Sequence, residues 1–333
     1  MNAQKNQVTC RICGTPGGEK FQVREMLFGS RQVFDYFQCP SCGCLQIEKI
    51  PDDMSAHYPD DYYSFALKTK KTRPWVSWLR TKRARYAIEK KGIIGKTLYT
   101  RKKPDPLICL YGDIGVKLTD SILDVGGGGG AHAKLLRQTG FKDALAIDKF
   151  IEQDIYLDGE LLTKKADLFE IKGQFDLITF HHSFEHMDGG LKILDRAKKL
   201  LAPGGRILIR IPCVSSKAWQ HYGVNWMALD APRHFYLHSH DSMRQLATQA
   251  SLNVKDLWCD SNMIQFWGSE QYAKDIPLND ARSYNVDPEN SIFSKDDIAR
   301  FQRQTEQVNK ELQGDTICVL LETDQPSAMA SER

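Results

Sequence analysis

The stretch Ile122-Leu123-Asp124-Val125-Gly126-Gly127-Gly128-Gly129-Gly130 decides the fold class. The apolar residues at its start predict a buried strand, and the run of glycines predicts a turn directly after it. Residues 131–138 carry apolar side chains at helical spacing, so a helix is expected next. A strand, a glycine turn and a helix in this order form the first half of a doubly wound α/β unit, whose ligand binds at the carboxyl edge of the sheet.

Asp124 distinguishes this turn from other glycine-rich turns. Glycines let a ligand approach the backbone and the amide groups at a helix N-terminus, and sites for nicotinamide and flavin cofactors contain similar turns. A carboxylate directly before the glycines is poorly suited to a pyrophosphate, because both groups are negatively charged. The pattern instead favours a ligand with a positive amino group and no phosphate, and S-adenosylmethionine is such a ligand.

At this point the chain resembles the class I S-adenosylmethionine-dependent methyltransferases, over roughly residues 120–260. The resemblance implies an α/β, Rossmann-like, seven-stranded methyltransferase fold. It rests on signals that follow the family's order: the strand and turn 122–130, the strand 144–147 ending at Asp148, the segment 166–169, the strand 175–180, and the turn and strand 200–209.

The resemblance also implies which residues bind the cofactor. Asp148 occupies the position of the family's acid that binds both ribose hydroxyls, and Asp167 lies where an acid faces the exocyclic amine of adenine. The expected cofactor-binding residues are Asp124, Gly126, Gly128, Gly130, Asp148, Asp167, Leu168 and His181.

The strand 175–180 runs directly into His181-His182-Ser183-Phe184-Glu185-His186. Methyl transfer to a hydroxyl or a carbon acid requires removal of a proton, and histidine is the most common general base because its pKa lies near neutrality. Glu185 and His186 resemble an acid–histidine pair of small-molecule and sugar methyltransferases. We therefore expect His186 to be the catalytic base, with Glu185 orienting it. His182 is the second candidate, and His234 is held in reserve.

Other interpretations of this segment stay open. One is that His186 only caps the next helix or forms hydrogen bonds within the fold. Another is that a divalent cation binds here and assists deprotonation. The pattern His182-x-x-Glu185-His186 also matches a metalloprotease motif, but that motif requires a helix, and this segment follows a strand.

Residues 212–240 predict a long irregular insert that contributes to acceptor binding, because aromatic side chains stack on the apolar faces of sugars and other rings. The insert resembles the lid region of bacterial methyltransferases of sugar and cell-envelope polysaccharide pathways. The N-terminal cysteine pairs and the run Tyr58-Pro59-Asp60-Asp61-Tyr62-Tyr63 share that resemblance. Arg233 is expected to bind a phosphate or carboxylate of the substrate.

Two C-x-x-C pairs stand near the N-terminus, Cys10 with Cys13 and Cys39 with Cys42, each followed by glycine. Each pair places two sulfur atoms on one side of a tight turn, and two such turns supply the tetrahedral ligands that Zn²⁺ prefers. A site with four protein ligands has no open position, so a structural zinc site is predicted. Cys44 in place of Cys42, or a redox-active pair, are the alternatives.

Residues 68–103 contain fourteen Lys or Arg and one acid, whereas the whole chain carries a net charge of only +3. Within this stretch, residues 75–91 lack proline and glycine, which favours a helix. Its roles could be packing on the protein through aromatic side chains, peripheral attachment to anionic lipid head groups, or contact with nucleic acid. Nucleic acid is the least favoured partner, because no N/D-P-P-Y motif for base methylation stands at the matching position, 181–184.

The 333 residues are 41% hydrophobic and 26% charged, which is typical of a globular protein. The lack of a long apolar run argues against a transmembrane helix and a signal peptide, so a cytoplasmic protein is expected, at most peripheral to the inner membrane. The expected regions are a zinc-binding module 1–50, a basic aromatic linker 51–110, a methyltransferase domain 111–325 and a disordered tail 326–333.

Together these motifs predict S-adenosylmethionine-dependent methyl transfer to a sugar, either nucleotide-linked or part of a surface glycan. Phosphate-bearing and lipid-linked acceptors fit the same expectation. A hydroxyl is the favoured acceptor atom. The alternatives are an O-methyltransferase of natural products or other small molecules, and an RNA-binding methyltransferase that uses the cysteine pairs and the basic stretch.

Overall fold

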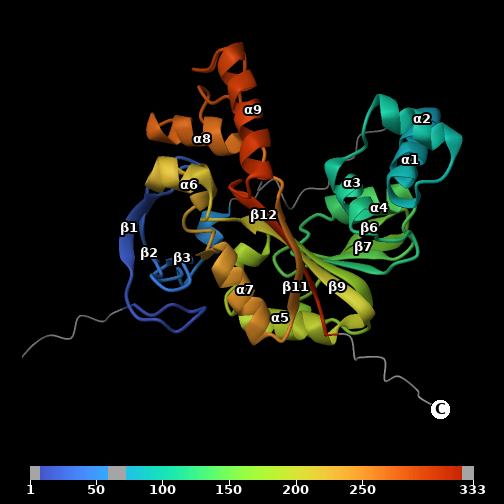
Figure 1. Ribbon diagram of the computed structural model, residues 1–333, viewed down its shortest axis with the longest axis horizontal. Helices are drawn as coiled ribbons and strands as arrows, with labels where there is room; N and C mark the ends of the chain where they lie inside the picture. The colour runs from blue at the N-terminus through green and yellow to red at the C-terminus, as the bar shows by residue number, and fades with distance from the viewer. Residues whose placement is uncertain (1–7, 59–72, 325–333) are drawn as a thin grey trace, which may run out of the picture. The chain divides into compact units, whose positions relative to one another are not determined.

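The computed structural model describes residues 8–58 and 73–324 of the chain. The chain divides into two compact units that alternate along the sequence. Unit 1 comprises Met1–Pro59, His182–Asp195 and Ile209–Asp324, and unit 2 comprises Asp60–His181, Arg196–Leu208 and Gln325–Arg333. Figure 1 allows these segments to be followed by colour from the N-terminus to the C-terminus.

Unit 2 is built on a mainly parallel sheet. Its strands are β4 (Ile122–Val125), β5 (Ala144–Asp148), β6 (Ile155–Leu157), β7 (Glu160–Lys165), β8 (Phe175–His181) and the first part of β9 (Leu201–Pro212). They lie in the order β9-β8-β4-β5-β7-β6, and β4 pairs in parallel with both β5 and β8. This arrangement confirms the predicted α/β, Rossmann-like fold. The antiparallel edge strand β6 was not predicted.

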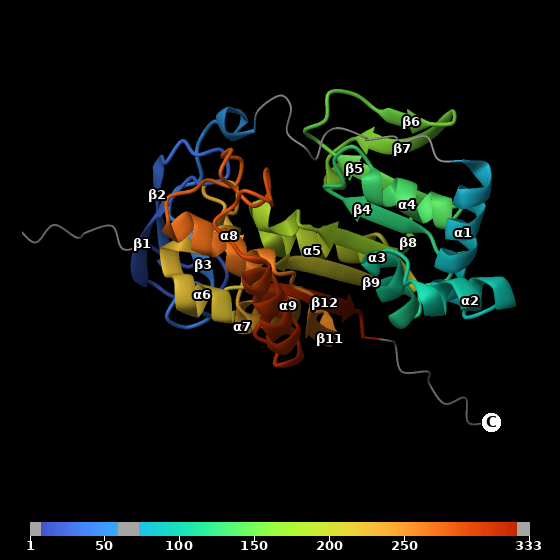
Figure 2. The same cartoon turned by 90° about the horizontal axis from the view of Figure 1, so that it is seen from above.

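The helix predicted after the glycine turn is α4 (Ala131–Thr139). It begins after Gly130, whose φ is +81°, and ends at Gly140, whose N–H donates to two carbonyls of the last turn. Ala133 on α4, Ala146 on β5 and Leu162 on β7 form one buried cluster. Figure 2 shows α4 beside β4, β5 and β7, so the turn is held between a strand and a helix that pack together.

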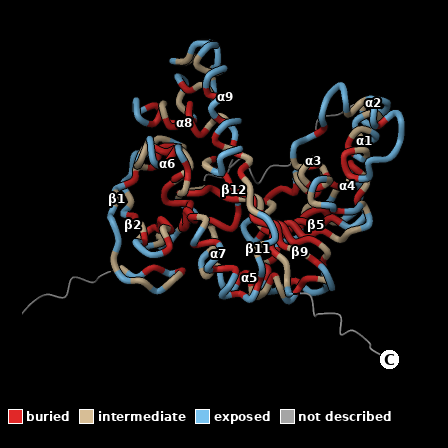
Figure 3. Tube along the Cα trace, in the orientation of Figure 1, coloured by how far each residue is buried: buried red, intermediate tan, exposed pale blue. Residues whose placement is uncertain are grey.

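Three helices precede the sheet of unit 2. They are α1 (Pro74–Glu89), which agrees with the helix predicted over 75–91, α2 (Ile93–Arg101) and α3 (Pro106–Asp113). The side chain of Asp105 caps α3 by accepting from the Leu107 N–H. Figure 3 shows that α1 and α2 are largely exposed, whereas β5 and β9 are mostly buried.

Unit 1 contains an antiparallel sheet in the order β1-β2-β3-β10. Three of its strands come from the N-terminus, namely β1 (Glu19–Arg24), β2 (Val33–Gln38) and β3 (Leu45–Ile47). The fourth, β10 (Tyr236–Leu237), comes from the aromatic insert and pairs with β3. The N-terminal segment that carries the cysteine pairs and the insert therefore contribute strands to one sheet.

The rest of unit 1 combines two antiparallel strands with helices. The strands β11 (Asn253–Cys259) and β12 (Thr316–Glu322) pair with each other, and β12 is followed in the sheet order by β9. The helices are α6 (Lys217–Tyr222), α7 (His240–Gln249), α8 (Ile264–Ala273), α9 (Lys295–Lys310), and the short turn η3 (Phe184–His186); α5 (Gly190–Lys199) crosses the boundary between units. A buried cluster that includes Phe266, Trp267 and Phe301 joins α8 to α9.

In the described part of the chain, every helix is too short or too polar to cross a bilayer. Most of the run 58–63, the first part of the basic stretch 68–103 and the expected disordered tail 326–333 lie outside the described residues.

Candidate active site

The glycine turn of unit 2 is fastened to the end of β5. The Gly126 N–H and the Gly127 N–H donate to the Ile147 carbonyl at 2.8 and 3.1 Å, and the Gly128 N–H donates to Asp148 Oδ2 at 3.0 Å. Burial raises the pKa of Asp148, and repulsion from Asp124 also raises it, although two backbone hydrogen bonds act in the opposite direction. The two carboxylates expected at the cofactor are therefore neighbours at one edge of the sheet.

Gly127 is required by close packing. A Cβ atom at this position would lie 2.6 Å from Asp124 Oδ2 and 2.9 Å from the Cβ of Ala146. Any other residue would displace the Asp124 carboxylate from its position. The glycine run therefore keeps the Asp124 carboxylate in place and also lets a ligand approach the backbone.

Asp124 is buried, and both of its carboxylate oxygens have a partner. Oδ1 accepts from Thr179 Oγ1 at 2.9 Å, and Oδ2 lies 3.2 Å from His132 Nδ1. Burial alone would raise the pKa of Asp124, but His132, His181 and Thr179 lower it below its ordinary value. The carboxylate is therefore ionised at neutral pH, as the binding of a cationic amino group requires.

Tyr111 joins the two histidines beside Asp124. Its hydroxyl lies 2.9 Å from His132 Nε2 and 3.1 Å from His181 Nε2, and the two imidazole rings pack edge to face at 4.5 Å. Sequence reasoning placed His181 here but missed His132 and Tyr111. His132 had a local signal, because it stands in the first turn of the helix after the glycines.

Asp167 and Leu168 follow β7, close to Asp148. The Ala166 N–H donates to the Asp148 carbonyl at 3.3 Å, which brings the segment to the end of β5. The Asp167 side chain accepts from the Phe169 N–H at 3.1 Å and caps the short turn η2 (Leu168–Glu170). Leu168 is buried. Asp167 thus serves as a helix cap.

A second cluster lies in unit 1, in the residues that follow β8. Glu185 is fully buried, and within the described residues neither carboxylate oxygen has a hydrogen-bond partner. The nearest nitrogens are His182 Nδ1 at 3.5 Å and His234 Nε2 at 3.9 Å. Coordinating atoms of Glu185, His186 and His234 lie within 4.8 Å of one another. The sequence candidates for the proton-transfer site are therefore brought together.

Backbone carbonyls fix the tautomers of two of these histidines. His186 Nδ1 lies 2.8 Å from the Arg233 carbonyl, and His234 Nδ1 lies 2.8 Å from the Ala228 carbonyl. A carbonyl only accepts, so each Nδ1 carries the proton and each neutral ring keeps its lone pair on Nε2. The Arg233 carbonyl, rather than Glu185, thus orients His186.

Burial and charge fix the ionisation of this cluster. Burial acts to raise the pKa of Glu185, but the neighbouring His182, His186 and His234 lower it to about 2. Burial and repulsion from His186 lower the pKa of His234 to about 4. At neutral pH, Glu185 is therefore ionised and His234 is neutral.

His182 has both ring nitrogens engaged. Its Nδ1 faces Glu185, and its Nε2 contacts the guanidinium of Arg210, which is itself held by Asp260 at 2.6 Å. The backbone of His182 is left-handed, with φ of +51°. Neither ring nitrogen is therefore available to a substrate hydroxyl in this arrangement.

Arg233 does not have the role expected from the sequence. Its side chain is fully buried and is paired with Glu25 at 2.9 Å and with Asp230. Two carboxylates neutralise the guanidinium, so the prediction that Arg233 binds a substrate anion was wrong. The residue instead ties the insert to the N-terminal region of unit 1.

The four cysteines of the C-x-x-C pairs come together in unit 1, with all four sulfurs within 4.8 Å of one another. The sulfurs of Cys10 and Cys42 are 3.6 Å apart, and those of Cys13 and Cys39 are 3.4 Å apart. The shared hydrogen bond lowers the pKa of Cys10 to about 4 and raises that of Cys42. Cys44 is buried outside this group and faces the Leu45 carbonyl. The donor set fits a tetrahedral Zn²⁺ site.

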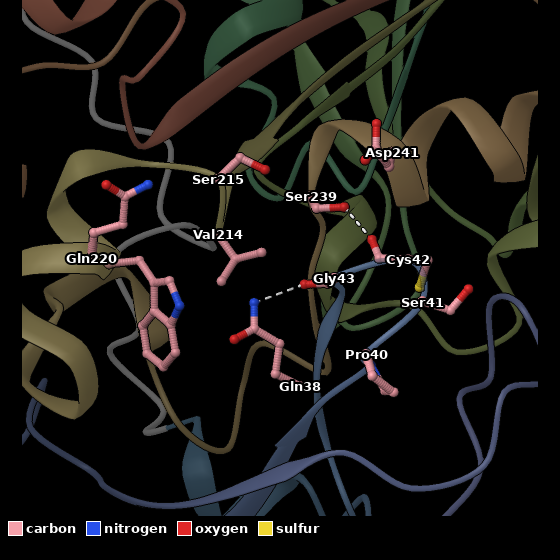
Figure 4. A pocket seen from close by; sticks show the side chains of 11 residues that line it. Gln38, Pro40, Ser41, Cys42, Gly43, Val214, Ser215, Gln220, Ser239 and Asp241 are labelled. Atoms are coloured by element: carbon pink, nitrogen blue, oxygen red, sulfur yellow. Dashed lines mark hydrogen bonds between the residues drawn. The ribbon is translucent and has the colours of Figure 1, made fainter.

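A groove of about 430 Å³ runs beside the second cysteine pair (Figure 4). Hydroxyl, amide and carboxylate groups line it together with one indole, from Gln38, Ser41, Ser215, Trp219, Gln220 and Asp241. The Gln38 amide donates to the Gly43 carbonyl at 3.0 Å, which fixes one wall. Such a mixture of polar groups and one aromatic side chain is suited to a polyhydroxylated ligand.

A family profile described as "Methyltransferase domain" matches residues 78–257, which is more than half of the chain. No curated protein matches the sequence. Similar solved structures include coclaurine N-methyltransferase bound to N-methylheliamine and SAH, at 16% identity over 70% of this chain and 75% of that one, with a TM-score of 0.41.

Two further structures are similar in fold. A putative sarcosine dimethylglycine methyltransferase from Galdieria sulphuraria is 16% identical over 62% of this chain and 80% of that one, with a TM-score of 0.40. An S-adenosylmethionine-dependent methyltransferase from Archaeoglobus fulgidus is 14% identical over 65% of this chain and 99% of that one, with a TM-score of 0.39.

Proposed function

The chain belongs to the methyltransferase-domain family and is an S-adenosylmethionine-dependent methyltransferase, and from this premise we propose that it methylates a hydroxyl group of a sugar. The cofactor, when bound, supplies the methyl group. The protein's part is to bind both reactants, align the acceptor oxygen and remove its proton.

The residues of unit 2 fit the cofactor. Asp124 offers an ionised carboxylate for the amino group, and Asp148 offers a carboxylate oxygen beside the glycine turn for the ribose hydroxyls. The short capped turn at Asp167 follows Ala166, which bonds to the Asp148 backbone, and we propose that Asp167 faces the adenine. Gly126, Gly128 and Gly130 leave the backbone open to close approach of the ligand.

His186 is the proposed general base, and one observation carries this assignment. Its Nδ1 proton is held by the Arg233 carbonyl, so the neutral ring presents the Nε2 lone pair as the proton acceptor. The buried anion of Glu185 stabilises the imidazolium that forms when the proton arrives. His234 lines the same cluster, and its low pKa keeps it a neutral partner rather than a second cation.

One feature of unit 1 supports a sugar acceptor. The groove beside the cysteine pair combines hydrogen-bonding side chains with Trp219. Most of the aromatic side chains of the insert do not add to this support, because Trp226, Phe235 and Tyr236 are buried in the fold. The remaining polar groups of the groove are well suited to hydroxyl-rich ligands, and we propose that a glycan segment binds there.

The base is tested by replacing His186 with Gln, which cannot accept the proton. We expect kcat to fall by roughly 10² to 10⁴-fold, while calorimetry shows unchanged binding of the demethylated cofactor. Added imidazole should restore part of the activity of His186→Ala. The exposed His221 gives the control variant, His221→Gln. Full activity of His186→Gln would remove this residue from the mechanism.

The acceptor class is tested with labelled methyl donor and a panel of nucleotide sugars, lipid-linked sugars and catechols. Label on a sugar hydroxyl, located by mass spectrometry, is the expected result. Label found only on an aromatic hydroxyl would overturn the sugar assignment while leaving the methyltransferase activity intact.

We also propose that Cys10, Cys13, Cys39 and Cys42 bind a structural Zn²⁺ ion. Elemental analysis of the purified protein should find about one zinc per chain, and the double variant Cys13→Ser/Cys39→Ser should lose it. The variant Cys109→Ser lies in α3 outside this group and should retain the metal. A wild-type protein without zinc that unfolds at the same temperature as a zinc-supplemented sample would contradict the proposal.

A further inference from the structure

The first two helices of unit 2 carry an exposed surface that has no part in the proposed methyl transfer. This surface, called here the α1–α2 surface, consists of Trp75 and Trp78 on α1, Ile93 and Ile94 on α2, and the lysines and arginines of residues 73–103. Trp75 is 61% exposed and Trp78 is 49% exposed, while Ile93 and Ile94 are 86% and 51% exposed. Large apolar side chains exposed on two helices that pack together are typical of a surface that binds another body.

Packing of the helix does not explain the tryptophans. The buried residues of α1 are Ala84, Ala87 and Ile88. At 100° per residue, Trp75 and Trp78 project from the opposite side of the helix. The two largest side chains of α1 therefore contribute nothing to the core of unit 2.

The charge of the same segment is strongly positive. Residues 73–103 contain eleven Lys or Arg and one acid, Glu89, which already pairs with Arg85 at 3.4 Å. The Lys82 ammonium lies over the Trp78 ring at 5.6 Å, so the positive and aromatic groups are interleaved. A surface of this kind attracts anions and also presents apolar groups that prefer to leave water.

We propose that the α1–α2 surface binds the anionic head groups of a lipid membrane. The basic side chains pair with lipid phosphates, and the tryptophans lie at the boundary between head groups and acyl chains, where indole rings are favoured. Ile93 and Ile94 favour a membrane over a nucleic acid as the partner of this surface. Exposed aliphatic groups gain free energy among acyl chains, whereas recognition of nucleic acid relies on charge and ring stacking.

This proposal is independent of the acceptor and goes beyond it. The test uses the full-length protein and sedimentation with vesicles of phosphatidylcholine, with and without about 30% phosphatidylglycerol. We expect the protein to sediment with the anionic vesicles only, and the bound fraction to fall as salt is added. Tryptophan emission should move to shorter wavelength on binding.

Three double variants test which side chains bind the vesicles. Arg80→Glu/Lys82→Glu should reduce the partition coefficient at least tenfold, about the effect of reversing two charges near an anionic surface. The control, Arg300→Glu/Arg303→Glu, makes the same charge change on exposed positions of α9 and should bind like the wild type. Trp75→Ser/Trp78→Ser should weaken binding and remove the shift in emission.

Three results would overturn the proposal. They are equal binding to neutral vesicles, no binding to anionic vesicles, and vesicle binding that Ile93→Ser/Ile94→Ser and Arg80→Glu/Lys82→Glu leave unchanged. If the protein binds single-stranded RNA but not vesicles, and Arg80→Glu/Lys82→Glu abolishes that binding, the surface belongs to a nucleic acid instead. Activity on a soluble acceptor should be the same in all these variants, which separates this result from a failure of the proposed function.

Discussion

Asp124 in unit 2 and Glu185 in unit 1 are both buried carboxylates beside histidines, yet they are held differently. Asp124 accepts a hydrogen bond from Thr179 at one oxygen, and its other oxygen lies 3.2 Å from His132 Nδ1. Glu185 has no hydrogen bond among the described residues, and its nearest nitrogen is 3.5 Å away on His182. Buried polar groups are usually paired, and an unpaired one marks a position where a ligand or a proton completes the arrangement. A carboxylate that is held in place by its neighbours suits cofactor binding. A buried carboxylate without a hydrogen bond suits proton transfer.

The largest expected effect separates these two acids. Glu185→Gln removes the buried charge that we propose stabilises a protonated histidine, so we expect kcat to fall by about 100-fold or more with cofactor affinity changed less than about twofold. Asp124→Asn removes the charge that we propose faces the cofactor amino group, so we expect affinity for the cofactor to fall by roughly 10 to 100-fold. Calorimetry and initial rates measure the two quantities separately.

The control for this pair is Asp158→Asn. Asp158 is exposed and has a left-handed backbone conformation, which asparagine tolerates. This variant should leave kcat and cofactor affinity unchanged. The comparison fails if Glu185→Gln weakens cofactor binding as strongly as Asp124→Asn does.

A second effect, of intermediate size, concerns the response of unit 1 to acid. Burial lowers the pKa of His238 to about 4, although Glu185 acts in the opposite direction. An unfolded histidine titrates near 6.5, so the unfolded state binds more protons between these values. The stability contributed by neutral His238 is complete above about pH 6.5, and up to about 3 kcal/mol is lost as the pH falls to about 4.

Urea unfolding at several pH values checks this expectation. The variant His238→Gln keeps a hydrogen-bonding side chain near Ser242 but does not titrate. Its stability should therefore decline less steeply between pH 6.5 and about 4 than that of the wild type. Parallel curves for the two proteins would show that His238 does not contribute to the acid response.

The smallest expected effect concerns Tyr111, whose hydroxyl contacts the two histidines beside Asp124. Tyr111→Phe removes the hydroxyl that contacts His132 and His181 but retains the ring. We expect a loss of about 1 to 2 kcal/mol of unfolding free energy and a weakening of cofactor binding of less than about tenfold. Tyr99→Phe, in the exposed α2, is the matched control. An effect as large as that of Asp124→Asn would mean that Tyr111 touches the cofactor directly.

Local patterns in the sequence predicted the parts of the fold that are contiguous along the chain. The strand, the glycine turn and the helix of residues 122–139 are one uninterrupted segment, and their pattern alone specifies β4 and α4. The meeting of the two cysteine pairs was also predictable, because four sulfurs at that spacing have few other uses. Asp148 was identified from the resemblance to the methyltransferase family, and its distance from Asp124 along the chain fits one strand–helix–strand unit.

The missed features depend on contacts between distant parts of the chain. Tyr111 lies on α3, before the sheet begins, and no local pattern indicates that its hydroxyl joins two histidines. Arg233 stands among aromatic residues that suggest a substrate site, but Glu25, 208 positions earlier, neutralises it. Such pairings are set by tertiary packing, so a single sequence shows the charge of Arg233 and not the partner that cancels it.

The chain crosses between the two units at His181 and His182, at Asp195 and Arg196, and at Leu208 and Ile209. The segments that supply Asp124, Asp148 and the glycine turn are thereby separate in sequence from those that supply His234, the cysteine pairs and the groove. Insertions or deletions between β9 and β11 can remodel unit 1, including the groove that we propose binds the acceptor, without altering any residue of the glycine turn. With the acceptor bound as proposed, a lineage built on this layout is free to change its acceptor while its methyl donor stays the same.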